Sequence, residues 1–344
     1  MKNPAVFAIG KLPARATAFP FESRDAALAS DRSRSRRFLS LNGPWKFAFS
    51  PNADKLPNGF ERPDFDVSGW KTIPVPADWQ AEGYDQPRYN NITYPFPANR
   101  PLIPHATNPV GSYRRDIDIP ADWAGQDMVL HIGGAGSAYY VWVNGQKVGY
   151  AQDSKLPSEF DVTRFTRPGR NSIAVQVYRW SDGSYLEDQD FWRVSGIERD
   201  VFLMAAPKTR VRDFFAHAGF DAEAGAGQLA VDVTVTAGAA TSARYVLMDG
   251  TRIVLEGRQA VAAGNAERTV TLTGRIDRVK PWTAETPNLY RLLVELYDAG
   301  GRIIQSSDAR IGFRTVAMRN GVVTVNGKPI HRSPMPSPTQ WSIS

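Results

Sequence analysis

Apolar and polar residues alternate with a period of two in many short segments of the first half of the chain, as in half-buried β-strands. Phe38–Phe49 alternates around Asn42-Gly43, and Ala138–Tyr150 alternates around Asn144-Gly145, so both segments predict hairpins with Asn-Gly turns. Residues 50–110 are instead rich in Pro, Asn, Asp and Gly, which indicates long loops. Many short strands without a competing amphipathic helix predict a sandwich of antiparallel sheets.

The pattern becomes simpler after Pro207. Between residues 208 and 315, Gly- and Ala-rich turns separate alternating strands such as Gln228–Thr236 and Tyr290–Tyr297. About seven strands over roughly 100 residues are typical of an immunoglobulin-like sandwich. Gly321–Ile330 then predicts another short hairpin. The last segment, residues 331–344, contains three prolines and four serines and predicts neither helix nor strand, so we expect a disordered tail.

Composition places the chain among ordinary globular proteins, because 42% of its 344 residues are hydrophobic and 22% are charged. The net charge of +6 is dispersed apart from Arg32–Arg37, so we expect no nucleic-acid partner. The chain has no cysteine and four widely separated histidines, which argues against disulfides and against a Cys- or His-based metal site. Neither a signal peptide nor a membrane span is evident, so we expect a cytoplasmic protein.

Four long segments carry a family resemblance. They are Phe38-Leu-Ser-Leu-Asn-Gly-Pro-Trp-Lys-Phe47, residues 78–95, residues 140–161 and residues 179–201, the last reading RWSDGSYLEDQDFWRVSGIERDV. Each resembles the corresponding segment of the large bacterial β-galactosidases of glycoside hydrolase family 2. The resemblance extends over residues 35–330, and matches of this length and order do not arise by chance.

The resemblance implies a jelly-roll sugar-binding domain, an immunoglobulin-like domain and a TIM barrel that carries two catalytic glutamates. From His331 the sequence departs from the family, and fourteen residues are far fewer than the roughly 200–250 that a barrel needs. We therefore expect an all-β chain without the barrel, ended by a frameshift or premature stop. The expected parts are an irregular arm (1–35), a jelly roll (36–207), an immunoglobulin-like sandwich (208–320) and a remnant of the barrel entry with the tail (321–344).

The same resemblance implies a galactose-binding site in the first domain. Asn91 matches a residue that lines the family's galactose pocket, and Asp190 matches the carboxylate that binds galactose hydroxyls beside a sodium ion. Trp192 follows in the same loop. A carboxylate that accepts from adjacent hydroxyls, next to an aromatic face, suits sugar recognition. The alternative is that residues 181–190 form an acidic surface loop without a ligand.

The resemblance also implies a magnesium site. Gln152 and Asp182 match two oxygen ligands of the kind that Mg²⁺ accepts. It offers Asn3 as a third ligand, although the family's acidic ligand just before this position has no counterpart here. The alternative for these side chains is a structural hydrogen-bond network at the edge of a sheet.

Two further functions stay open from the residues alone. The region 153–190 is rich in acids, and two carboxyl groups at suitable spacing would make a small autonomous glycosidase, with Asp190, Glu187 and Asp182 as candidate catalytic residues. The other alternative is a structural fragment that self-associates as a homo-oligomer through apolar surfaces. The leading hypothesis is a galactoside-binding chain of the β-galactosidase type.

Overall fold

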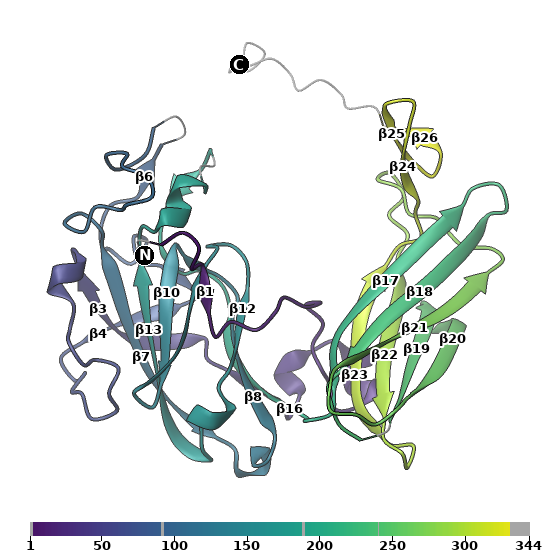
Figure 1. Cartoon of the computed structure of the whole chain (residues 1–344), viewed down its shortest axis with the longest axis horizontal. Helices are drawn as coiled ribbons and strands as arrows, with labels where there is room; N and C mark the ends of the chain where they lie inside the picture. Colours follow the sequence, from purple (N-terminus) through teal and green to yellow (C-terminus); the bar gives the residue numbers. More distant parts are fainter. Residues whose placement is uncertain (1–2, 91–92, 188–189, 240, 331–344) are drawn as a thin grey trace. The chain divides into compact units, whose positions relative to one another are not determined.

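A computed structural model describes residues 3–90, 93–187, 190–239 and 241–330. The chain forms two compact units, one made from Met1–Ala14 and Asp31–Lys208, the other from Arg15–Ser30 and Thr209–Ser344 (Figure 1). The described residues contain one α-helix, the six-residue α1 (Arg24–Ala29), and are otherwise built from strands, short 3₁₀ helices and loops. The predicted all-β fold is thus confirmed. No helix in these ranges is both long enough and apolar enough to cross a membrane.

The first unit is a sandwich of two antiparallel sheets. In order across the larger sheet, the strands are β1 (Ala8–Ile9), β11 (Gln146–Gln152), β10 (Ala138–Val143), β13 (Gly169–Tyr178), β7 (Val110–Ile119), β3 (Gly43–Ser50) and β4 (Lys71–Val75). The smaller sheet contains β12 (Ser158–Asp161), β8 (Asp127–Ile132), β16 (Val201–Ala206) and β2 (Phe38–Ser40). The architecture is the predicted jelly roll.

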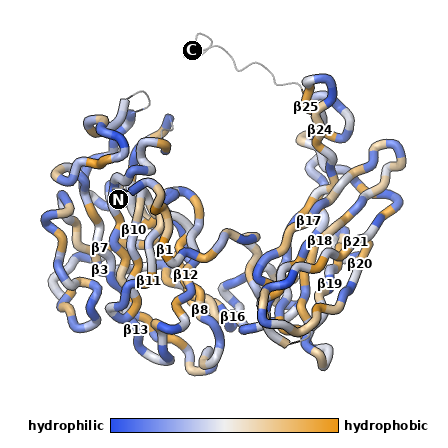
Figure 2. The backbone as a smooth tube through the Cα atoms, in the orientation of Figure 1, coloured by the Kyte–Doolittle hydropathy of each residue, from blue (hydrophilic) through white to orange (hydrophobic). Residues whose placement is uncertain are grey.

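Alternating burial fixes which face of each strand meets the core. On β10, Tyr139, Val141 and Val143 are buried, and they belong to the same core cluster as Trp45 and Leu130 from other strands. The strands accordingly carry the more hydrophobic positions and the loops at their ends are largely hydrophilic (Figure 2). Because the side-chain period of a strand is two, a slip of one residue would expose this whole set.

Of the two predicted Asn-Gly hairpins, one is confirmed and one is wrong. Asn144 and Gly145 have positive φ values of 51° and 80° and join β10 to β11 in a tight turn, as a type I′ hairpin requires. Asn42-Gly43, by contrast, links β2 to β3, which lie in different sheets. The reason is Leu41, which is 1% exposed and belongs to the core cluster. Because Leu41 packs in the core, the chain crosses from one sheet to the other here instead of turning back.

Short elements complete the loop-rich parts of this unit. Two small ladders join β6 (Arg88–Tyr89) to β14 (Trp192–Arg193), and β5 (Ala77–Asp78) to β15 (Gly196–Ile197) and β9 (Ala135–Gly136). The 3₁₀ helices are η1 (Arg32–Arg34), η2 (Ala53–Lys55), η3 (Ala121–Trp123), η4 (Thr163–Phe165) and η5 (Asp182–Tyr185).

The second unit packs a three-stranded sheet against a four-stranded one, as an immunoglobulin-like sandwich does. The first sheet contains β17 (Val211–Asp221), β18 (Ala226–Val235) and β21 (Arg268–Ile276). The second contains β20 (Arg252–Val261), β19 (Thr241–Asp249), β22 (Tyr290–Tyr297) and β23 (Ile303–Ile311). A separate small sheet follows, made from β24 (Val316–Arg319), β25 (Val322–Val325) and β26 (Lys328–Pro329).

Part of the N-terminal arm belongs to the second unit. Phe21 exchanges backbone hydrogen bonds with Ser306 on β23, and Ser23 caps α1 by accepting a hydrogen bond from Ala26 N. This segment is anchored by an ion pair between Arg24 and Glu295, whose side chain is completely buried. The expected disorder of residues 331–344 lies outside the described residues.

Candidate functional site

The β6–β14 ladder presents two aromatic rings and a carboxylate on the surface of the jelly roll. Tyr89 lies opposite Trp192 in the register, with 5.8 Å between the ring centroids. The Tyr89 hydroxyl donates a hydrogen bond to Asp190 Oδ1, which raises the pKa of Tyr89. The two rings are 52% and 57% exposed. We call these three residues, Tyr89, Asp190 and Trp192, the Trp192 surface.

A buried arginine is hydrogen-bonded to the backbone on both sides of this surface. The Arg179 side chain is 1% exposed and forms an ion pair with Asp85. Its Nη2 also donates to the backbone oxygens of Gln86, at 2.9 Å, and Arg193, at 3.1 Å. Burial lowers the pKa of Arg179, although Asp85 opposes this effect. One guanidinium group therefore joins the loop before β6 to strand β14.

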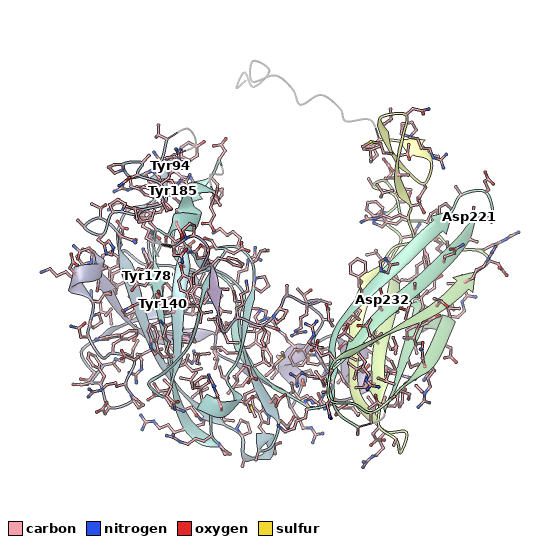
Figure 3. The ribbon with its side chains drawn as sticks, in the orientation of Figure 1. Tyr94, Tyr140, Tyr178, Tyr185, Asp221 and Asp232 are labelled. Atoms are coloured by element: carbon pink, nitrogen blue, oxygen red, sulfur yellow. The ribbon has the colours of Figure 1, made fainter. Side chains whose placement is uncertain are left out.

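An aromatic cluster holds the loop formed by residues 93–108. Phe96, Trp180 and Tyr185 form a small buried cluster apart from the main core, with Tyr94 packed against it. The Tyr185 hydroxyl donates to Leu102 O at 2.8 Å and accepts from Asn99 N at 3.1 Å. Tyr94 and Tyr185 lie side by side at this end of the unit (Figure 3), with ring centroids 5.0 Å apart. Since Tyr185 is the last residue of η5, the cluster fixes the position of this 3₁₀ helix within the acidic segment 181–190.

The structure brings together two of the three proposed magnesium ligands. Gln152 and Asp182 are both buried, and the Gln152 amide donates to Asp182 Oδ1 and to the Tyr150 hydroxyl. Asp182 Oδ2 is buried and accepts no hydrogen bond from the described residues, so it suits a cation ligand. Asn3 is exposed, and its side chain accepts from Ala5 N.

The three candidate catalytic acids have separate partners. Asp190 accepts from Tyr89, Asp182 from Gln152, and Glu187 from both the backbone nitrogen and the hydroxyl of Ser154. Among the described residues, no hydrogen bond joins two of these carboxylates. Across the same ranges, no cluster of three or more His, Cys, Asp or Glu side chains suits a metal ion either.

Asp190 and Trp192 stand two residues apart in the sequence, and in the structure Tyr89 contacts both of them. Asn91 lies outside the described residues. Reasoning from the sequence missed Tyr89 and the buried Arg179. Tyr89 stands 101 residues from Asp190, and strand segments as short as β6 and β14 carry no periodic signal.

Comparisons with known proteins agree with this architecture. Residues 38–207 match the family model described as "Glycosyl hydrolases family 2, sugar binding domain", and residues 209–314 match "Glycosyl hydrolases family 2". A β-galactosidase of Priestia megaterium is 39% identical over 95% of this chain. One from Vibrio vulnificus is 41% identical over 89% of the chain. The chain spans about a third of the length of these relatives, 33% and 30%.

Solved structures share the fold at lower sequence identity. A Bacteroides uniformis β-glucuronidase superposes with a TM-score of 0.70 at 20% identity, covering 86% of this chain and 34% of that one. A Ruminococcus gnavus β-glucuronidase gives 0.64 at 18% identity, covering 86% of this chain and 49% of the other. At these identities the similarity concerns the fold alone.

Proposed function

Because the chain belongs to glycosyl hydrolases family 2, we propose that its jelly-roll domain binds carbohydrate through the Trp192 surface. The observation that carries this proposal is the exposed pair of rings, Tyr89 and Trp192, with the Asp190 carboxylate beside them. We further propose that the sugar is a terminal β-galactoside and that the chain serves a β-galactosidase type of activity. The identity with proteins named β-galactosidase supports this second step.

The chemistry of the three side chains suits a sugar ring. An ionised carboxylate accepts hydrogen bonds from hydroxyls and donates none, so Asp190 selects a donor. An indole exposed over half of its surface offers an apolar face to the C–H side of a sugar. Tyr89 holds one oxygen of Asp190 and leaves the other for a ligand. Asn91 is proposed as a further contact by family resemblance.

Two cations form part of the proposal. Gln152 and the unpartnered oxygen of Asp182 would hold Mg²⁺, which would neutralise a buried carboxylate at the start of η5. Sodium is proposed beside Asp190. Within the chain itself, Asp182 and Gln152 already position the 3₁₀ helix from which the acidic loop begins. We expect Asp182→Asn to remove a rise in melting temperature that Mg²⁺ produces in the wild-type chain.

The test of sugar binding is calorimetric titration of the chain with methyl β-D-galactoside. We expect Asp190→Asn to weaken binding by about tenfold, since a charged acceptor makes a hydrogen bond roughly twice as strong as a neutral one. Trp192→Ala should weaken it similarly by removing the apolar face. The matched control is Glu82→Gln, an exposed acid elsewhere in the unit. Equal affinity in all four proteins, or no binding at all, would overturn the proposal.

A further inference from the structure

A cavity of about 320 Å³ opens in the first unit beside the Trp192 surface but without its three residues. Residues 153–155, in the loop after β11, line one wall, and described residues between Ser184 and Glu198 line the other. The lining residues that matter here are Gly136, Asp153, Lys155, Glu187, Phe191 and Glu198. Its volume falls within the range of about 300–1,000 Å³ that small-molecule sites occupy.

Hydrogen bonds between the two walls preform the cavity. The Glu187 carboxylate accepts from Ser154 N at 3.0 Å and from Ser154 Oγ at 2.9 Å. Within the second wall, Arg193 Nη1 donates to Glu187 O at 3.2 Å. Lys155, from the first wall, forms an ion pair with Glu198, from the second. A ligand therefore finds its contacts in place, which limits the cost of ordering side chains on binding.

One carboxylate oxygen at the cavity wall lacks a partner. Glu198 Oε2 takes the ion pair from Lys155, but Glu198 Oε1 is buried and accepts no hydrogen bond among the described residues. The position of Glu198 Oε1 depends on the missing side chain of Gly136, because a Cβ added there would lie 3.1 Å from Oε1. Burial raises the pKa of Glu198, while Lys155 opposes the rise. A buried acceptor left open is costly, so a bound donor would stabilise it.

The remaining lining favours a neutral ligand. Asp153 is exposed, and its carboxylate accepts no hydrogen bond from the described residues. Phe191 is 39% exposed and supplies apolar surface near the Lys155 ammonium. Three acidic and three basic side chains line the cavity, so their charges favour neither an anion nor a cation. An unpaired buried carboxylate oxygen and an exposed carboxylate, beside an aromatic ring, call for a hydroxylated ring.

We propose that this cavity is a second carbohydrate site, separate from the Trp192 surface, which takes one neutral sugar ring through hydrogen bonds donated to Glu198 and Asp153. The ligand class rests on the proposed function of the domain, whereas the cavity and its two carboxylates without a hydrogen-bond donor on at least one oxygen do not. Sugar in the cavity would also cover the Lys155 amine, whose side chain is 44% exposed without it. That amine is therefore a local reporter of occupancy.

The experiment measures acetylation of individual lysines by peptide mass spectrometry, with and without D-galactose or D-glucose. At a sugar concentration about three times the dissociation constant, Lys155 should react about fourfold more slowly, since a quarter of the sites stay open. Lys55, an exposed lysine outside the cavity, should react at an unchanged rate. Each variant is compared with itself, with and without sugar, because Glu198→Gln also removes the ion pair.

Glu198→Gln should lower the protection of Lys155 by weakening binding about tenfold, and Asp153→Asn, which leaves that ion pair intact, should lower it too. Asp190→Asn should leave the protection unchanged. Protection lost in Asp190→Asn but kept in Glu198→Gln would overturn the cavity site. So would unprotected Lys155 at sugar concentrations that saturate the Trp192 surface by calorimetry, a result that leaves the proposed function standing. If sugar protects Lys155 but Asp190→Asn leaves the affinity measured by calorimetry unchanged, the cavity site is supported and the Trp192 surface is refuted. If neither method detects binding, both sites are refuted.

Discussion

Replacing Glu295 with glutamine removes a buried charge from the second unit while keeping its shape. The Glu295 carboxylate is fully buried and accepts from Arg24 Nε at 2.7 Å, Arg24 Nη2 at 2.6 Å and the Tyr297 hydroxyl at 2.7 Å. Glutamine offers one oxygen in place of two, and its NH₂ group would face a donor from Arg24 or Tyr297. The variant therefore loses at least one charged hydrogen bond and gains a donor–donor contact.

The size of the effect follows from the exposure of the two partners. Breaking a fully buried ion pair costs about 3–5 kcal/mol. The Arg24 side chain is 33% exposed and regains water when its partner changes, so we expect a loss nearer to about 2–3 kcal/mol in the free energy of unfolding. For a unit of roughly 150 residues, that loss lowers the melting temperature by about 5–10 °C.

Differential scanning calorimetry near pH 7 measures this shift. The control is Glu256→Gln, since Glu256 also pairs with an arginine, Arg244, at 2.6 Å but is 53% exposed. An exposed pair contributes about 0.2–1 kcal/mol, so this variant should melt within about 3 °C of the wild-type chain. A melting temperature for Glu295→Gln as close to wild type as that of Glu256→Gln would show that the buried ion pair adds no more stability than the exposed one.

The same variant has a defined dependence on pH. Burial tends to raise the pKa of Glu295, but hydrogen bonds from Arg24 and Tyr297 outweigh it, and the pKa lies below its ordinary value of 4.5. A depressed pKa in the folded state stabilises the protein above the unfolded pKa, and this contribution disappears as the pH falls through the folded pKa. The difference between Glu295→Gln and wild type should thus stay constant above about pH 5 and narrow in more acidic solution.

Two further predictions concern packing in the first unit. Gly111→Ala places a Cβ 2.7 Å from Trp79, a ring with no exposed surface. We therefore expect the free energy of unfolding, measured by calorimetry, to fall by about 2–3 kcal/mol. The control Gly69→Ala, whose Cβ would have no atom within 4 Å, should be nearly neutral. Tyr185→Phe removes the hydrogen bond to Leu102 O and should speed amide hydrogen exchange in the 93–108 loop by about tenfold, for a loss near 1.4 kcal/mol. Unchanged exchange in that loop would show that the aromatic packing alone holds it.

The fold class was predictable from the sequence because the patterns that determine it are local. Alternating burial along β10 and the Asn144-Gly145 turn depend on neighbouring residues, and both are as the pattern predicted. Asn42-Gly43 looks similar by sequence, yet the chain there crosses between sheets. The crossing depends on Leu41 meeting the core, and distant strands supply that core. Local turn chemistry cannot report such a tertiary contact.

The site was foreseen in part, for the same physical reason. Asp190 and Trp192 are close in sequence, so their proximity was predictable. The tyrosine that fixes the Asp190 carboxylate comes from a strand 101 residues earlier, and its partner strand has only two residues. Likewise, the pairing of Arg24 with Glu295 joins positions 271 residues apart, so nothing in the sequence around either one signals it. Paired polar groups of this kind become visible only in the folded chain.

A crystal structure of the chain soaked with methyl β-D-galactoside would test the proposed function most directly. We expect a sugar ring stacked on the exposed face of Trp192, with ring hydroxyls within hydrogen-bonding distance of the Asp190 carboxylate. The same crystals grown from Asp190→Asn should show the sugar at lower occupancy. Sugar bound elsewhere on the jelly roll with the Trp192 surface empty, or equal occupancy in wild-type and Asp190→Asn crystals, would rule out the Trp192 surface as the galactoside site.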